Sequence, residues 1–388
     1  MAQKTLEDIL PVLRRRPDVE APNLQAWDAT DRLLLDSAAA HVSAGSTVAV
    51  IGDRYGALTL GALAVLNPGA VRVHQDLITG EQALRLNAAT VLDKVLDNRA
   101  GGGLPFTQLP LGRELLEDAG TVLLQLPKTL AELDEIAAAV ATYASPEVVL
   151  LAGGRVKHMS LGMNAVLERH FRSVTPQLAR QKSRVIVATG GQGSEDPERF
   201  PVVEHLAEID LDVAAHGAVF AGARLDIGTR FLLTFLPSMR PAQHAIDLGC
   251  GTGILAAMYA RQHPGSTVTA TDQSAAAVAS ALATARANGL AGQIRALQDD
   301  AMGTLPEGSA DLILLNPPFH VGAGVHAGAG LKLIEAAGRV LAPGGELWTV
   351  FNRHLGYLPA LERHVGPTVV KGQNPKFTVT LSTPRSLR

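Results

Sequence analysis

Short apolar runs alternate along the chain with longer segments whose apolar residues recur at helical spacing. Residues 47–51 and 311–315 are continuously apolar after their first residue, which is typical of strands buried on both faces of a sheet. Strands that alternate with helices build parallel sheets, so the pattern predicts an α/β fold. Further strands are predicted at 71–74, 121–124, 147–151, 184–187, 267–271, 294–297, 346–351 and 376–381, the last antiparallel at or near an edge. Helices are predicted at 24–41, 130–143 and 274–288, and one ends at Phe171.

The second half of the chain repeats the first at a nearly constant spacing. Two glycines, a four-residue strand end and a Leu-Glu-Arg-His segment recur with offsets of 197, 191 and 194 residues in a chain of 388. Such a spacing indicates an internal duplication of one Rossmann-like α/β unit. The matched pairs are Gly52 and Gly56 with Gly249 and Gly253, 125–128 with 316–319, and 167–170 with 361–364.

A segment with linker composition lies between the two copies. Residues 189–199 combine glycine, serine, proline and charged residues. We therefore predict a first domain at 1–190, a linker at 191–205 and a second domain at 206–388.

The first copy lacks features of the second. Arg54 stands where the second copy has Gly251, and Lys128 stands where it has Phe319. We expect this copy to be degenerate and catalytically silent, and to serve packing and substrate recognition. Ordinary solvated loop charge is the alternative explanation for Lys128 and Asp53.

The stretch 247–253 is a glycine loop between a predicted strand and a predicted helix. Glycine lets the backbone turn tightly and approach a ligand closely. A dinucleotide fingerprint would need glycine at position 254, where this chain has isoleucine. The acidic residue and the glycine spacing resemble the cofactor loop of S-adenosylmethionine (SAM) methyltransferases, with a purely structural turn as the alternative. The residues assigned to the cofactor here are Asp247, Gly249, Gly251 and Gly253.

Asn316, Pro317, Pro318 and Phe319 follow the buried strand 311–315. Open α/β sheets place their ligands at the carboxyl ends of such strands. Two prolines remove two amide donors and leave carbonyls free to accept hydrogen bonds. An amide, a free carbonyl and an aromatic ring together suit a planar group with an exocyclic NH2. The motif resembles that of amino-directed methyltransferases, so we assign catalysis to Asn316, Pro317 and Phe319.

Three acidic residues complete the predicted cofactor site. Asp272 ends the second strand of this domain, 21 residues beyond Gly251, where nucleotide-binding sheets present a carboxylate to ribose hydroxyls. Asp299 and Asp300 follow the third strand, and of the two we assign Asp300 to the adenine amino group, with ordinary loop charge as the alternative for both. Asp226 precedes a helix and either caps it or contacts the methionine end of SAM.

The composition of the chain argues against several classes of protein and against a metal site. The net charge is −3 and aromatic residues make up 4%, which argues against a protein that coats duplex nucleic acid or offers a broad stacking platform. The chain has one cysteine, and its histidines lack metal-ligand spacing, so we expect no metal. No apolar run of about 18 residues is present, and we expect a cytoplasmic monomer without a membrane partner.

Over nearly its whole length the chain resembles the two-domain bacterial ribosomal RNA guanine-N2 methyltransferases. The resemblance rests on the duplicated halves, the glycine loop, 225–228, 316–320 and 352–355. Two further segments, 24–27 and 126–130, look most like the large-subunit (23S) branch, and the small-subunit (16S) branch shares the catalytic motifs.

The resemblance implies methyl transfer from SAM to the N2 amine of a guanine in ribosomal RNA or in a ribosomal subunit precursor. Asn316 and the Pro317 carbonyl would accept the two amino protons, and Phe319 would stack on the base. A glutamine-directed protein methyltransferase is one alternative, although it would not need the first copy. A non-catalytic RNA-binding or assembly protein is another, although it would not need an intact glycine loop with Asp272.

Overall fold

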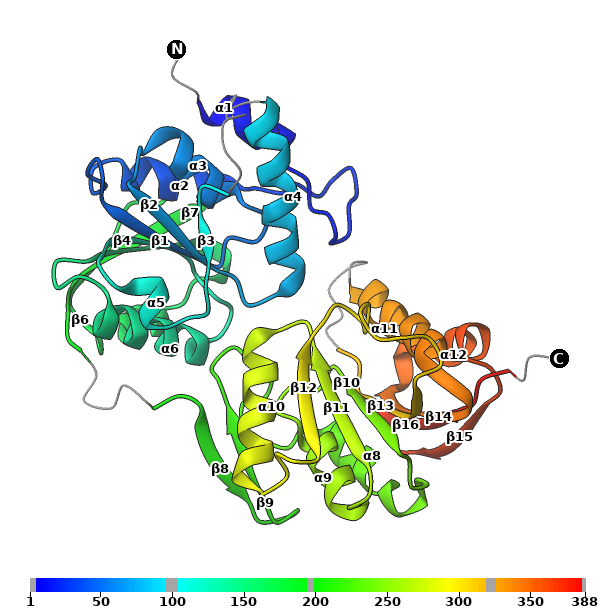
Figure 1. Cartoon of the computed structure of the whole chain (residues 1–388). Helices are drawn as coiled ribbons and strands as arrows, with labels where there is room; N and C mark the ends of the chain where they lie inside the picture. Colours follow the sequence, from blue (N-terminus) through cyan, green and yellow to red (C-terminus); the bar gives the residue numbers. More distant parts are fainter. Residues whose placement is uncertain (1–4, 95–103, 194–198, 319–325, 386–388) are drawn as a thin grey trace. The chain divides into compact units, whose positions relative to one another are not determined.

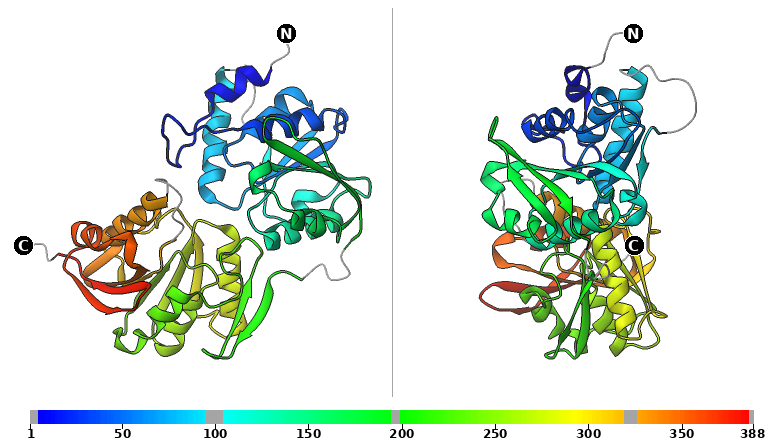
Figure 2. Two further views of the ribbon diagram at one scale, coloured as in Figure 1. Left: turned by 180° about the vertical axis from the view of Figure 1, so that it is seen from behind. Right: turned by 90° about the vertical axis from the view of Figure 1, so that its left-hand side faces the viewer.

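The computed structural model describes residues 5–94, 104–193, 199–318 and 326–385. The chain separates into two compact units, Met1–Phe200 and Pro201–Arg388. Each unit contains a seven-stranded mixed sheet covered by helices on both faces (Figures 1 and 2).

The first unit has the strand order β3-β2-β1-β4-β5-β7-β6. Strands β1 to β5 pair with one another in parallel. Strand β7 is antiparallel to both β5 and β6. The strands are β1 (Thr47–Ile51), β2 (Ala70–His74), β3 (Thr107–Gln108), β4 (Ala119–Gln125), β5 (Val149–Arg155), β6 (Phe171–Pro176) and β7 (Ser183–Gly191). The α-helices are α1 (Leu6–Ile9), α2 (Ala29–Ala38), α3 (Ala57–Val65), α4 (Ile78–Lys94), α5 (Arg113–Leu116), α6 (Leu130–Tyr143) and α7 (Leu161–Leu167).

The second unit repeats this order as β12-β11-β10-β13-β14-β16-β15, and it adds an antiparallel hairpin of β8 and β9. Strand β16 is antiparallel to β14 and β15. The strands are β8 (Val202–Leu206), β9 (Leu211–Ala215), β10 (His244–Leu248), β11 (Thr267–Asp272), β12 (Ile294–Gln298), β13 (Ala310–Leu315), β14 (Leu341–Asn352), β15 (Thr368–Gln373) and β16 (Phe377–Ser382). The α-helices are α8 (Ile227–Leu233), α9 (Ile254–Gln262), α10 (Ala275–Ala287), α11 (His326–Val340) and α12 (Leu358–His364).

The two seven-stranded sheets correspond strand by strand. Adding 197 to the residue numbers of β1 gives those of β10, and the same shift converts α3 into α9. Both loops between these pairs end on a glycine N-cap in the left-handed region, Gly56 and Gly253. The spacing found in the sequence therefore corresponds to a shared topology.

Several sequence predictions need correction. The first sheet is mixed rather than parallel, because β7 is antiparallel to β5 and β6, whereas in the second sheet the antiparallel strand predicted at 376–381 is confirmed as β16, next to the edge strand β15. The predicted helix 24–41 begins only at Ala29, because the Asp28 side chain accepts from the Thr30 N–H and caps it. The helix expected to end at Phe171 ends at Leu167, and Phe171 instead begins the edge strand β6. The two edge strands β6 and β15 were not predicted, because they lack a buried apolar run.

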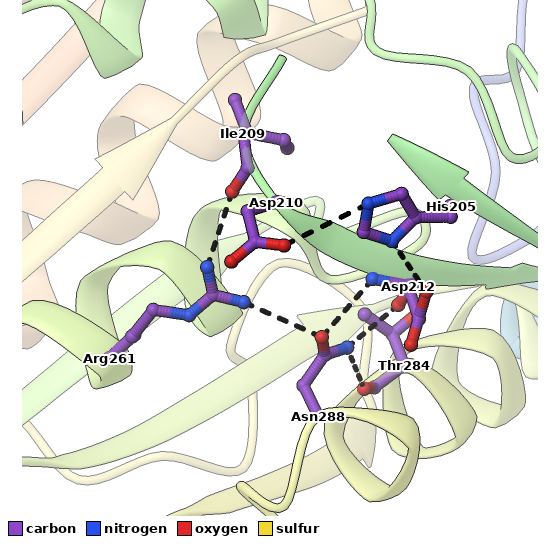
Figure 3. A network of polar contacts seen from close by, with 7 residues as sticks. All are labelled: His205, Ile209, Asp210, Asp212, Arg261, Thr284 and Asn288. Carbon is purple, nitrogen blue, oxygen red and sulfur yellow. Dashed lines mark hydrogen bonds and ion pairs between the residues drawn. The ribbon is translucent and has the colours of Figure 1, made fainter. Parts of the chain in front are cut away.

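Side chains on α10 and at its C-cap attach the β8–β9 hairpin to the second unit, and Figure 3 shows the contacts of Asn288 with Asp212. Ser280, Thr284 and Asn288 lie four residues apart, on one face of the helix. They accept from the backbone N–H groups of His216, Ala214 and Asp212, at 2.9, 3.0 and 3.1 Å. These hydrogen bonds take the place of a second neighbouring strand for β9, which pairs with β8 on its other side. They also hold residues 212–216, from which the chain continues toward the glycine loop.

Candidate active site

The glycine loop joins β10 to α9 at the carboxyl edge of the second sheet. Gly249, Gly251 and Gly253 have φ angles of 73°, 51° and 76°. A side chain would be strained in this left-handed region, so each of the three positions favours glycine.

Two of the three loop glycines face open space. Among the described residues, a Cβ on Gly249 would meet nothing within 4 Å beyond its chain neighbours, and one on Gly251 would meet only Val219 Cγ1 at 3.9 Å. A Cβ on Gly253 would lie 2.9 Å from Ala281 Cβ, so this glycine allows α9 to pack against α10. The backbone is therefore approachable at Gly249 and Gly251, whereas Gly253 serves packing.

Asp272 ends β11, and its carboxylate is held beside the glycine loop. Its Oδ2 accepts from the Gly251 N–H at 3.1 Å, and its Oδ1 accepts from the Ser274 N–H at 3.0 Å. Because β10 and β11 are adjacent and parallel, their carboxyl ends bring Asp272 and the loop together.

Asp247 lies beneath the loop rather than on its open side. It is buried within β10, and its Oδ2 accepts from the Ala256 N–H at 2.9 Å, in the first turn of α9. Burial, with a smaller contribution from the negative charge of Asp272, raises the pKa of Asp247 to about 8. This carboxyl group anchors the strand–helix turn from inside.

Asn316 follows β13, and its side-chain amide is oriented by two acceptors. Its Nδ2 donates to Asp226 Oδ2 at 3.1 Å and to Thr229 Oγ1 at 2.9 Å. Its Oδ1 is buried, and no described residue donates to it. A buried amide oxygen without a donor is costly, so it marks a position where a ligand donor would fit.

Asp226 caps α8, which is one of the two roles expected from the sequence. Its Oδ2 accepts from the N–H groups of Gly228 and Thr229 at 2.9 and 3.1 Å, besides the contact with Asn316. The same oxygen thus joins the start of α8 to the end of β13.

The two acidic residues after β12 have different surroundings. Asp299 is buried, and its Oδ2 accepts from the N–H and the hydroxyl of Thr304 at 2.9 and 2.7 Å. Asp300 forms an ion pair with Lys332 of α11. Because β11 and β12 are adjacent and parallel, Asp300 lies at the same sheet edge as Asp272. Its carboxylate is paired with the Lys332 ammonium group.

The remaining residues of the Asn-Pro-Pro-Phe motif are only partly described. Pro317 is buried and Pro318 is exposed. Phe319 and His320 lie outside the described residues, so the expected stacking role of Phe319 stays a prediction.

Sequence reasoning missed Thr229 and Lys332. Thr229 lies in the first turn of α8, three residues after the capping Asp226, and only its contact with Asn316 reveals its place. The signal was the pairing of a capping aspartate with a hydroxyl residue in the following turn. For Lys332 we find no comparable signal in the sequence.

The equivalent loop of the first unit is filled by its own side chains. Asp53 is buried, and its carboxylate accepts from the Gly56 N–H and from the N–H and hydroxyl of Thr59, at 2.6–3.0 Å. Burial raises the pKa of this carboxyl group. Gln75 stands at the position of Asp272, and its Nε2 donates to the Asp53 carbonyl oxygen at 2.9 Å.

The first unit also contains a counterpart of the Asn316 contact. Gln125 is the last residue of β4, at the position that corresponds to Asn316. Its Nε2 donates to Asp31 Oδ1 at 2.6 Å. Burial, followed by the nearby charge of Asp53, raises the pKa of Asp31 to about 7. An amide and a carboxyl group thus occupy the places that Asn316 and Thr229 hold in the second unit.

Within the described part of the chain, no group of three or more His, Cys, Asp or Glu side chains is arranged to hold a metal ion. None of the helices in that part is long and apolar enough to cross a bilayer.

Comparisons with known proteins match both units. The family model for the RLMG N-terminal domain matches residues 1–192, and the model for the methyltransferase small domain matches residues 210–381. The ribosomal RNA large subunit methyltransferase G of Streptomyces coelicolor is 35% identical, over 95% of this chain and 96% of its own length. The protein of the same name from Pseudomonas aeruginosa is 34% identical, over 95% of this chain and 96% of its own.

A solved structure shares the two-unit fold. The 16S rRNA N2 methyltransferase of T. thermophilus, in complex with AdoMet and guanosine, aligns with a TM-score of 0.73 and 19% identity over 98% of this chain and 100% of that one. The resemblance inferred from the sequence is confirmed: the chain belongs to the ribosomal RNA large subunit methyltransferase G family.

Proposed function

We propose that this chain is a SAM-dependent methyltransferase that modifies the exocyclic N2 amine of a guanine in large-subunit ribosomal RNA. Relatives with this name are 35% identical over nearly the whole chain. The observation that carries the proposal is the buried Oδ1 of Asn316, an acceptor without a described donor at the carboxyl end of β13.

The residues at this sheet edge fit SAM. Gly249 and Gly251 present open backbone, and Asp272 is held where a carboxylate can accept from ribose hydroxyls. We assign the adenine end to Asp300. Asp247 supports the loop from below rather than contacting the ligand.

The chemistry follows from what these residues offer to the target amine. When bound, SAM supplies an electrophilic methyl group, which guanine N2 accepts as the carbon–sulfur bond breaks and its electron pair stays on sulfur. Asn316 Oδ1 and the Pro317 carbonyl accept the amino N–H groups, align N2 and stabilise the positive charge that develops there. Once nitrogen is cationic its proton is acidic and leaves to water, so no dedicated strong base is needed. Phe319 stacks on the base in this scheme.

Turnover of the Asn316→Ala variant on large-subunit ribosomal RNA tests the proposal. The loss of one preorganised acceptor lowers the methylation rate on the order of 100-fold or more, while SAM affinity stays near that of the wild type. Gln125→Ala is the matched control, because Gln125 holds the equivalent position in the first unit. Methylation by Asn316→Ala at the wild-type rate would contradict the proposed grip on the amine.

For the first unit we propose an origin by duplication and a role in RNA recognition. The shared strand order supports the first part. Exposed Arg172, Arg180 and Lys182 on the β6–β7 hairpin support the second, because cations bind RNA phosphates. Arg169, which precedes β6, is instead paired with Asp134, with 3.6 Å between Nη1 and Oδ1. We propose ribosomal RNA or a ribosomal subunit precursor as the partner of a cytoplasmic monomer.

A further inference from the structure

We infer that Thr229 and Asp226 are positioning residues, which fix the orientation of the Asn316 amide so that its oxygen, and not its nitrogen, meets the target amine. The inference rests on the proposed function of Asn316. It assigns a role to Thr229 and replaces the expected contact of Asp226 with SAM by a contact with the catalytic amide.

Both protons of the amide nitrogen are used inside the protein. Nδ2 carries two donors, and it has two acceptors, Asp226 Oδ2 at 3.1 Å and Thr229 Oγ1 at 2.9 Å. Oδ1 is the other end of the same planar amide group, is buried, and has no described donor. The amide therefore offers a substrate one group only, an acceptor.

The carboxylate of Asp226 excludes the flipped amide. An ionised carboxylate only accepts hydrogen bonds, so a flipped Asn316 would place Oδ1 against Asp226 Oδ2. The flip would also direct two N–H donors toward the guanine amine, which itself donates. Asp226 thus selects the one orientation of Asn316 that binds an NH2 group.

The two positioning residues are themselves anchored. Asp226 Oδ2 accepts from the N–H groups of Gly228 and Thr229 at the start of α8, so the carboxylate cannot rotate away without the helix losing its cap. Thr229 is 9% exposed, which shields its hydroxyl from competing water. The orientation of the amide plane is therefore set by two hydrogen bonds from Asn316 to the start of α8.

Substitutions separate this role from helix capping. Asparagine caps helices about as well as aspartate, so Asp226→Asn keeps the cap but adds a donor that tolerates the flipped amide. Thr229→Val removes the hydroxyl at nearly constant shape, and Thr229→Ser restores it. Asp28→Asn is the matched control, because Asp28 caps α2 of the first unit in the same way.

The experiment measures turnover on large-subunit ribosomal RNA, the dissociation constants of SAM and of free guanosine, and the thermal unfolding temperature. We expect kcat to fall roughly 10- to 100-fold in Asp226→Asn and about fivefold in Thr229→Val, with recovery to within about twofold in Thr229→Ser. Guanosine affinity should fall in the first two variants, while SAM affinity, unfolding temperature and the Asp28→Asn control stay near wild type.

The outcomes distinguish the inference from the proposal beneath it. Wild-type kcat in both Asp226→Asn and Thr229→Val, with an inactive Asn316→Ala, would overturn the positioning role and leave the proposed function standing. Wild-type kcat in Asn316→Ala would overturn both. A loss in Thr229→Val that serine does not restore, together with a lower unfolding temperature, would show a structural role and overturn the inference.

Discussion

The two units of this chain share a strand order but differ at the carboxyl edges of their sheets. In the second unit, the backbones of Gly249 and Gly251 face open space. The Asp272 carboxylate and the buried Asn316 Oδ1, which no described residue donates to, lie at the same edge. In the first unit, Asp53 bonds back into its own loop and Gln75 donates to it. The comparison shows that a fold can keep its sheet while its ligand edge is filled by the protein's own groups.

The substitutions that distinguish the loops have separate physical effects. Arg54 carries a side chain at the position of Gly251, whose backbone faces open space. Gln75 in place of Asp272 removes a charge, and an amide is a weaker acceptor for ribose hydroxyls than a carboxylate. Each change alone is expected to weaken a SAM site, in line with the proposal that the first unit is catalytically silent.

The largest expected effect comes from converting the second loop into the first. Gly251→Arg places a bulky side chain at a φ of 51° and in the ligand's space. Left-handed backbone costs a non-glycine residue about 1–2 kcal/mol, and the steric clash adds to it. We expect SAM affinity to fall on the order of 100-fold or more, measured by calorimetry.

The reverse change serves as its control. Arg54→Gly should not create a second SAM site, because Asp53 and Gln75 still fill the first loop. A second binding event in this variant would mean that Arg54 alone separates the two units.

An effect of intermediate size is expected on RNA binding, where the β6–β7 hairpin of the first unit is compared with the β15–β16 hairpin of the second. Residues 177–182 between β6 and β7 are exposed, and we expect Arg172, Arg180 and Lys182 to contact phosphates. The affinity for RNA falls as salt rises, so the slope of log K against log salt is negative. Replacing all three residues by glutamine should reduce the magnitude of this slope by roughly 0.7 for each lost contact with single-stranded RNA. Lys371→Gln with Lys376→Gln, in the β15–β16 hairpin, is the control, and an unchanged slope in the triple variant would contradict recognition by the first unit.

The smallest effect concerns the buried carboxyl group of the first unit. The folded-state pKa of Asp31 is raised to about 7, above its unfolded value near 3.9, so folding favours the protonated form. Its contribution to stability is complete below pH 4 and is lost as the pH rises through 7. Asp31→Asn does not titrate, so we expect it to unfold a few degrees above the wild type at pH 8 and to lose this advantage toward pH 5, as measured by thermal melts.

The sequence predicted the parts of this site that depend on local pattern. The glycine loop and the ends of β11 and β13 follow from apolar runs that stop at Gly, Asp and Asn. Parallel pairing then brings these ends to one edge. The internal offset of 197 indicated two similar units before any topology was known.

The rest depended on contacts between distant residues. Thr229 and Asn316 are 87 positions apart, and only the fold, which brings the first turn of α8 to the residue after β13, shows that they touch. The different tasks of Gly251 and Gly253 are invisible in the sequence, because both are glycines at alternate positions and only one faces Ala281. The assignment of Asp247 to the cofactor stays a prediction, and only the structure shows that this residue is buried and accepts from the Ala256 N–H.

The most direct test of the account is a calorimetric titration of the intact chain with SAM. Because only the second unit offers open loop backbone beside a carboxylate, we predict one site per chain. Asp272→Ala should weaken it by roughly 1–3 kcal/mol, since charge-assisted hydrogen bonds are lost, while Gln75→Ala should leave it unchanged. Two equivalent sites, or undiminished binding by Asp272→Ala, would contradict the assignment of the cofactor to the second unit.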